Sequence, residues 1–172
     1  MHSQSKKAYE TKMSFLTVTF GDILLCTCTK RPVILEKQLE IIRKEPDNGD
    51  ALKFLCQYYL NKGDYSKTIT YAEIMKNVAD KTKNPLLQLY SYIYQAQAQM
   101  MSGREKIAKK NLNLSLELAT KLNNDSTLCS VYGSLGLYSA NIETDYYRAI
   151  RWFIKVSNWH NKIISNNNTL CF

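Results

Sequence analysis

The stretch YLNKGDYSKTITYA, residues 59–72, places a sharp corner between two helical patterns. Before the corner, residues 50–62 carry apolar side chains at steps of three and four, which is the spacing of an amphipathic helix. Gly63 is suited to the left-handed conformation that ends a helix. Asp64 is suited to cap the next helix, which we expect over residues 65–82. The stretch therefore predicts a helical hairpin.

The same corner recurs along the chain. In MMSGREKIAKKNL, residues 100–112, Gly103 lies 40 residues after Gly63. A third copy over residues 136–153 lacks the corner glycine but repeats the Asp-Tyr pair at Asp145. Three units of about 40 residues predict a repeat architecture, because a single helical hairpin cannot bury its apolar face alone.

The small and aromatic residues around these corners resemble the tetratricopeptide repeat (TPR) family over residues 33–155. In the first copy, the Gly-x-Tyr corner is Gly63 and Tyr65, and Thr68 and Ala72 follow it. The resemblance implies an all-α fold, built as a right-handed superhelical stack of antiparallel helical hairpins. The other matching positions are Leu52, Leu55, Cys56, Tyr59, Tyr92, Ala96, Gly103, Ala108, Leu112, Ser115, Leu135, Gly136, Tyr146 and Ala149.

The repeats differ from the TPR pattern in their length. The usual TPR unit has about 34 residues, and extra turns over residues 77–84 and 118–125 would lengthen the second helix of a pair. Long units of this kind resemble the TPR-like domains of bacterial regulators, which sense or receive a signal for an attached output module. The resemblance therefore implies the regulatory part of a bacterial signalling or transcriptional regulator.

Local signals set the expected limits of the repeat region. Pro32 favours the start of a helix over residues 33–45, and Asp50 is the expected N-cap of the helix over residues 50–62. The predicted organisation is an N-terminal extension or signal segment (1–31), a TPR-like helical repeat domain (32–160) and a C-terminal tail (161–172).

The C-terminal tail does not resemble the polar helix that normally closes a repeat stack. Trp159, Ile163 and Ile164 suggest a short helix packed on the last pair, and the Asn run at 166–168 suggests a frayed end. Two hypotheses follow: the chain is a fragment of a longer regulator, or the tail is read in a shifted frame.

Composition and charge narrow the classes of function. The chain has 172 residues, 45% apolar residues, six glycines and three prolines, which favours one helical globular domain. Its net charge of +8 is spread along the sequence, whereas nucleic-acid binders usually concentrate positive charge. No phosphate loop, nucleophile elbow or metalloprotease motif occurs, and there are two histidines. We therefore expect no enzymatic activity, no cofactor and no metal site.

The N-terminal residues have the order of a bacterial lipoprotein signal. Lys6, Lys7 and Lys12 precede an apolar stretch that leads to Cys26, a possible lipidation site. Asp22 interrupts that stretch, so the alternative is an extension without a targeting role. A cytoplasmic location is favoured over the periplasm, and membrane association requires lipidation of Cys26.

The resemblance places function in a concave groove that the first helix of each pair lines, and it implies a protein or peptide partner. The alternative for each residue is an ordinary solvated or inter-repeat position. Carrying the family's groove positions onto this chain gives Lys53, Gln57, Asn61, Tyr90, Tyr94, Gln97, Met101, Ser130, Ser134 and Asn141.

Two alternative functions follow from other features. A lipid-anchored periplasmic TPR protein with a role in assembly would use Cys26. A nucleic-acid binder would use the basic cluster formed by Arg104, Lys106, Lys109 and Lys110, although nucleic acid is not the expected partner. The sequence gives no indication of the oligomeric state.

Overall fold

The structure of the chain is a computed structural model that describes residues 31–168. Over these residues it contains seven helices and no strand, which confirms the all-α class. Backbone contacts divide the chain into two units, Met1–Lys37 and Gln38–Phe172. Cys26 and the N-terminal apolar stretch lie outside the described residues. The helices are α2 (Arg31–Lys44), α3 (Gly49–Asn61), α4 (Tyr65–Thr82), α5 (Pro85–Met101), α6 (Glu105–Leu122), α7 (Asp125–Asn141) and α8 (Tyr146–Asn168).

The corners predicted between paired helices are confirmed. Gly63 and Gly103 have φ values of +75° and +74°, in the left-handed region that favours glycine. Asp64 caps α4, since its carboxylate accepts a hydrogen bond from the backbone N–H of Lys67 at 3.1 Å. In the third corner Thr144 takes the left-handed conformation at φ +53°, and the Asp145 carboxylate caps α8.

In each of the pairs α3–α4, α5–α6 and α7–α8, an asparagine N-cap precedes the first helix. The side-chain oxygens of Asn48, Asn84 and Asn124 accept hydrogen bonds from backbone N–H groups in the first turns of α3, α5 and α7. The prediction that Asp50 caps the first of these helices is wrong. Asn48 has the extended backbone of an N-cap, whereas Asp50 lies inside the first turn, where its charge favours the positive end of the helix dipole.

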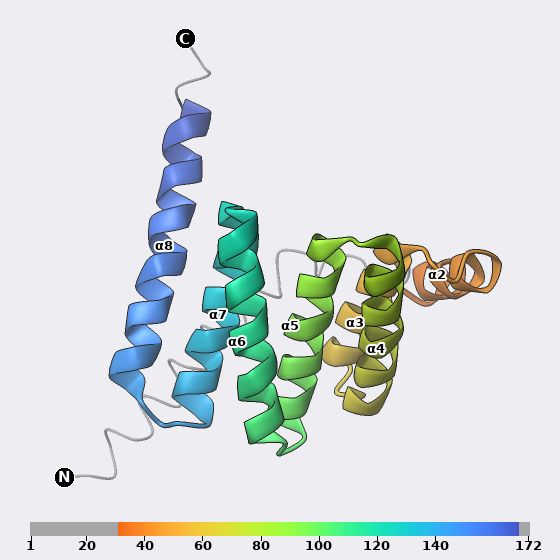
Figure 1. Ribbon diagram of the computed structural model, residues 1–172, viewed down its shortest axis with the longest axis horizontal. Helices are drawn as coiled ribbons and strands as arrows, with labels where there is room; N and C mark the ends of the chain where they lie inside the picture. The colour runs from red at the N-terminus through yellow and green to blue at the C-terminus, as the bar shows by residue number, and fades with distance from the viewer. Residues whose placement is uncertain (1–30, 169–172) are drawn as a thin grey trace. The chain divides into compact units, whose positions relative to one another are not determined.

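The helices α3 to α8 follow one another in chain order, and each packs on the next (Figure 1). Alternate helices behave differently. Cα atoms of α3 and α5 approach within 8 Å, and so do those of α5 and α7. The helices α4, α6 and α8 do not come this close to one another within the described residues. The first helices of the pairs are therefore the more closely spaced row.

Two clusters of buried side chains form the core. One joins α3, α4 and α5 around Leu52, Cys56 and Met75, and the other joins α5, α6 and α7 around Leu112 and Val131. The small residues expected at helix crossings are buried, as close approach of helices requires. These residues are Cys56, Ala96, Ala108, Gly136 and Ala149.

The last helix is longer than the sequence suggested. In place of a separate short helix after residue 155, α8 runs without a break from Tyr146 to Asn168 and includes the asparagine run. The physical reason is that this stretch contains neither Gly nor Pro, so no residue in it ends a helix. None of the described helices is both long enough and apolar enough to cross a membrane.

Candidate partner-binding face

The residues predicted to line a groove lie on α3, α5 and α7. Within α3 and α5 most of them follow one another at steps of three or four residues, so each set lies on one face of its helix. Because α3 approaches α5, and α5 approaches α7, the three sets form one continuous surface. We call this surface the inner face and define it by the ten residues predicted from the sequence.

A cation and an aromatic ring join α3 to α5 on the inner face. The Lys53 ammonium nitrogen lies 3.7 Å from the centroid of the Tyr90 ring, which is within the range of a cation–π interaction. Both side chains are half-buried. Lys53 is therefore held by its neighbour rather than extended freely into solvent.

A chain of hydrogen bonds continues this surface. The Tyr94 hydroxyl donates to Gln57 Oε1 at 3.3 Å, and Gln57 Nε2 donates to Asn61 Oδ1 at 2.9 Å. Burial raises the pKa of the Tyr94 hydroxyl, which keeps that group neutral and able to donate. Tyr94 is buried, so it connects α5 to α3 and offers no surface to a partner.

A second hydrogen-bonded set joins α5 to α7. Gln97 Nε2 donates to Ser134 Oγ at 3.0 Å, and Ser134 Oγ in turn donates to the backbone carbonyl of Ser130 at 3.1 Å. Ser134 is buried, so its role in the structure is to connect the helices. Met101 and Asn141 are exposed at the last positions of α5 and α7. The groups available to a partner are thus Gln57, Asn61, Ser130, Met101 and Asn141, with parts of Lys53, Tyr90 and Gln97.

Charge is distributed unequally between the two helices of each pair. The helix α5 contains no Asp, Glu, Lys or Arg, and α7 contains only Asp125, at its first position. The second helices α4 and α6 carry several charges of both signs. We did not predict this difference, although the long uncharged run over residues 84–103 is visible in the sequence. The inner face is therefore a nearly uncharged surface of amides, hydroxyls, aromatic rings and methionine.

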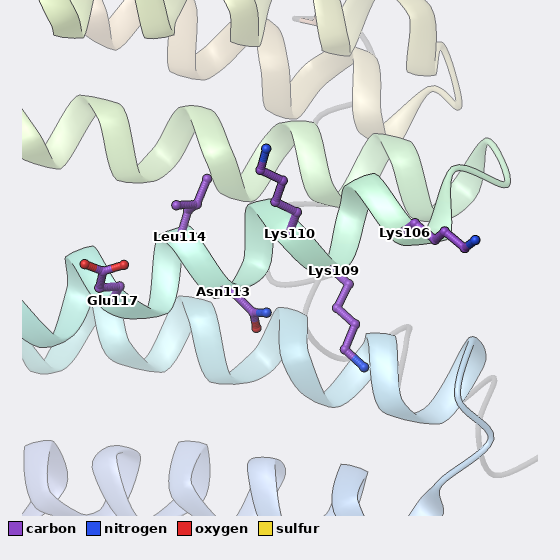
Figure 2. A pocket seen from close by; sticks show the side chains of 6 residues that line it. All are labelled: Lys106, Lys109, Lys110, Asn113, Leu114 and Glu117. Carbon is purple, nitrogen blue, oxygen red and sulfur yellow. The ribbon is translucent and has the colours of Figure 1, made fainter.

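The basic cluster lies on and just before α6, beside a shallow depression of about 430 Å³ (Figure 2). Figure 2 shows Lys110 and Leu114 extending to one side of the helix, and Lys109 and Asn113 extending to the other. Arg104 and Lys106 lie near the start of α6. The cations of the cluster do not converge on one point.

One cation of the cluster is paired with a carboxylate. Lys109 Nζ lies 2.6 Å from one Glu143 oxygen, and Arg148 lies 2.9 Å from the other. The hydrogen bond from Lys109 is the main reason that the pKa of Glu143 is lowered, with a further contribution from Arg148. A negative charge inside the cluster reduces its attraction for phosphate groups.

Two features of the described residues bear on reactive chemistry. No three side chains of His, Cys, Asp or Glu lie together as metal ligands between residues 31 and 168. Burial raises the pKa of the Cys56 thiol to about 12, and that side chain is enclosed between α3 and α4. The thiolate is the reactive form of cysteine, so Cys56 is an inert core residue.

Comparison of the chain with protein-family models, with curated proteins and with solved structures found no match.

Proposed function

We propose that the chain is a non-enzymatic scaffold that binds a segment of a partner protein on the inner face. The observation that carries this proposal is the nearly uncharged surface of α5 and α7, whose side chains are connected by hydrogen bonds across neighbouring helices. A surface held in this way is preorganised, so little conformational entropy is lost when a partner binds.

The spacing of the helices supports a TPR-like stack with a concave side. The first helices approach one another more closely than the second helices do, and a row that is tighter on one side curves towards that side. The corner glycines, 40 residues apart, and the Asp145 corner agree with three related hairpins. We propose a right-handed superhelical arrangement, which places the inner face on the concave surface.

The chemistry of the inner face indicates the kind of partner. Amide groups at Gln57, Asn61 and Gln97 hydrogen-bond to a peptide backbone or to polar side chains, while Tyr90 and Met101 offer adaptable apolar contact. We therefore propose an extended or helical peptide segment with few charges. We also propose, from the resemblance of the long repeats, that the chain is the regulatory part of a bacterial signalling or transcriptional regulator.

The alternative functions have less support. Nucleic-acid binding by the basic cluster is opposed by the Lys109–Glu143 ion pair and by the divergence of the remaining cations. A lipid anchor at Cys26 would change the location of the protein and leave the inner face as its binding surface.

The proposal is tested by capturing partners from source-cell lysate with two triple variants. The first variant, Gln57→Ala, Asn61→Ala and Met101→Ala, alters exposed positions of the inner face. The matched control, Ile107→Ala, Asn113→Ala and Thr120→Ala, alters exposed positions of α6. Circular dichroism establishes that both variants keep the wild-type helix content.

We expect a protein that wild type and the control retain and that the inner-face variant loses. Its affinity for the inner-face variant should fall about tenfold or more, since a loss of about 1.4 kcal/mol has that effect. Binding should change little between low and high salt, because the face is nearly uncharged. A partner that both variants bind equally, or one whose binding collapses in salt, would refute the proposal.

A further inference from the structure

The last helix exposes more large apolar side chains than any other described helix. Tyr147 is 86% exposed, Ile154 is 52% exposed and Phe153 is 41% exposed, although all three are large apolar side chains. Together with Tyr146 and Ile150, which are also exposed, they form a continuous stripe along the first half of α8. We call these five residues the end face.

The end face is distinct from the face by which α8 packs in the fold. Ala149 is buried, and the Trp152 ring stacks on Tyr132 of α7 at 5.4 Å between centroids. Phe153 lies at the border between the two faces: one side of its ring packs on Gly136 of α7, where an added Cβ would lie 2.7 Å from the ring, and the rest of it is exposed. The helix thus uses one face for the core and leaves the other uncovered.

The repeat pattern indicates what covers such a face. Ala72, Leu112 and Phe153 are each the eighth residue of α4, α6 and α8. Ala72 belongs to a buried cluster that includes Tyr94 of α5, and Leu112 belongs to a buried cluster that includes Val131 of α7. In both cases the first helix of the next pair contributes side chains to the cluster in which the position is buried. The corresponding position in α8 is suited to the same kind of neighbour, which is a helix.

The end face is also more apolar than the equivalent surfaces within the fold. The second residues of α4, α6 and α8 are Ser66, Lys106 and Tyr147. At the ninth position α4 has Glu73 and α6 has Asn113, both exposed, whereas α8 has Ile154. An exposed apolar stripe of this kind marks an interaction surface, since soluble proteins rarely leave one uncovered.

The positive charge of α8 indicates the kind of partner that the end face binds. The helix contains Arg148, Arg151, Lys155 and Lys162 and no acidic residue. Arg151 forms no ion pair with a described residue, and Lys155 lies over the rings of Tyr132 and Trp152. A second copy of α8 would bring like charges together in a chain that already carries +8. An acidic partner instead gains from these cations.

We infer that the end face binds an amphipathic helix of another protein, with an apolar stripe flanked by Asp or Glu. The stripe packs on Ile150, Phe153 and Ile154, and the flanking carboxylates lie near Arg151 and Lys155. This inference is independent of the inner face, because it uses only α8.

Three synthetic peptides of about 20 residues test the inference with the full chain. They share one leucine stripe and differ only in their flanking residues, which are Glu, Gln or Lys. Both tryptophans of the chain, Trp152 and Trp159, lie on α8, so intrinsic fluorescence reports binding there. The test variant is Ile150→Ser with Ile154→Ser, and its matched control is Leu86→Ser with Ile107→Ser, at exposed positions of α5 and α6. Arg151→Gln and its control Lys110→Gln test the charge.

The Glu peptide should bind best, and the Ile150→Ser, Ile154→Ser variant should bind it about tenfold more weakly than wild type or the control. Arg151→Gln should weaken Glu-peptide binding and reduce its salt dependence, whereas Lys110→Gln should not. Equal binding of the Glu and Lys peptides, failure of all three to bind, or equal loss in the control would overturn the inference. So would α8-dependent binding to phosphatidylserine vesicles without peptide binding, or a dimer in light scattering that the double variant abolishes.

Discussion

A buried polar cluster between α5 and α6 allows a quantitative test of what holds two neighbouring helices in register. Asn111 Nδ2 donates hydrogen bonds to Gln95 Oε1 at 3.2 Å and to Gln99 Oε1 at 2.9 Å. All three residues are buried, and the described residues contain no buried side-chain nitrogen or oxygen without a partner. The Asn111→Ala substitution therefore leaves two buried amide oxygens without their donor.

The expected cost follows from these contacts. Each buried acceptor that loses its partner costs about 1–3 kcal/mol. The gain in helix propensity from Asn to Ala returns about 0.5 kcal/mol. Because two acceptors are affected, the net loss in the free energy of unfolding is about 1.5–5.5 kcal/mol, equivalent to a fall in Tm of about 3–22 °C for a chain of this size.

Asn113→Ala is the matched control, because it makes the same substitution at an exposed position of the same helix. We expect it to raise stability slightly, through helix propensity alone. The variant with leucine at Gln95, Gln99 and Asn111 together should lose less stability than Asn111→Ala, because it leaves no unpaired amide. Urea and thermal unfolding followed by circular dichroism measure all three. If Asn111→Ala and Asn113→Ala unfold within about 0.5 kcal/mol of each other, the reasoning fails.

Two further predictions concern the corners. Thr144→Gly should stabilise the protein by about 0.5–1 kcal/mol, since a β-branched residue is strained at φ +53°. Gly63→Ala, at φ +75°, should instead cost about 1 kcal/mol. Urea titrations that show a stability change of the same sign for both substitutions would contradict the left-handed conformation of these two residues. Glu143→Gln should lower stability by about 1 kcal/mol at pH 7. The pKa of Glu143 is lowered in the folded state, so its contribution is complete above its unfolded pKa and is lost as the pH falls below about 4. The difference between wild type and Glu143→Gln should therefore disappear in acid, and a constant difference down to pH 2 would exclude the ion pair as its cause.

The sequence determined the positions of the corners and the type of each element. Gly63 and Asp64 end one helix and start the next through local backbone conformation and capping, so α4 has the predicted limits of residues 65–82. The N-cap of α3 was predicted wrongly as Asp50, because Asn48 and Asp50 are both good capping residues and only the backbone conformation distinguishes them. The full length of α8 was not predicted, because asparagine is common at helix ends, whereas this stretch has no Gly or Pro to end the helix and continues through residues 166–168.

The candidate site was predictable in part. Helical spacing was enough to place the inner-face residues on the first helix of each pair. It was not enough to say which of them reach solvent, since Tyr94 and Ser134 are buried only because α3 and α7 come close to α5. The pairing of the basic cluster could not be predicted for the same reason. Its four cations are close together in sequence, but the carboxylate that pairs with Lys109 lies 34 residues away.

One physical difference separates what the sequence determined from what the tertiary structure decided, and it is the range of the interactions. Helix ends, corners and amphipathic faces depend on interactions within a few residues, and the sequence of this protein determined them by itself. Burial, ion pairing and the exposed apolar stripe of α8 depend on which helices become neighbours. Only the tertiary structure decided that Tyr94 is buried, that Glu143 joins Lys109 and Arg148, and that Tyr147, Phe153 and Ile154 stay uncovered.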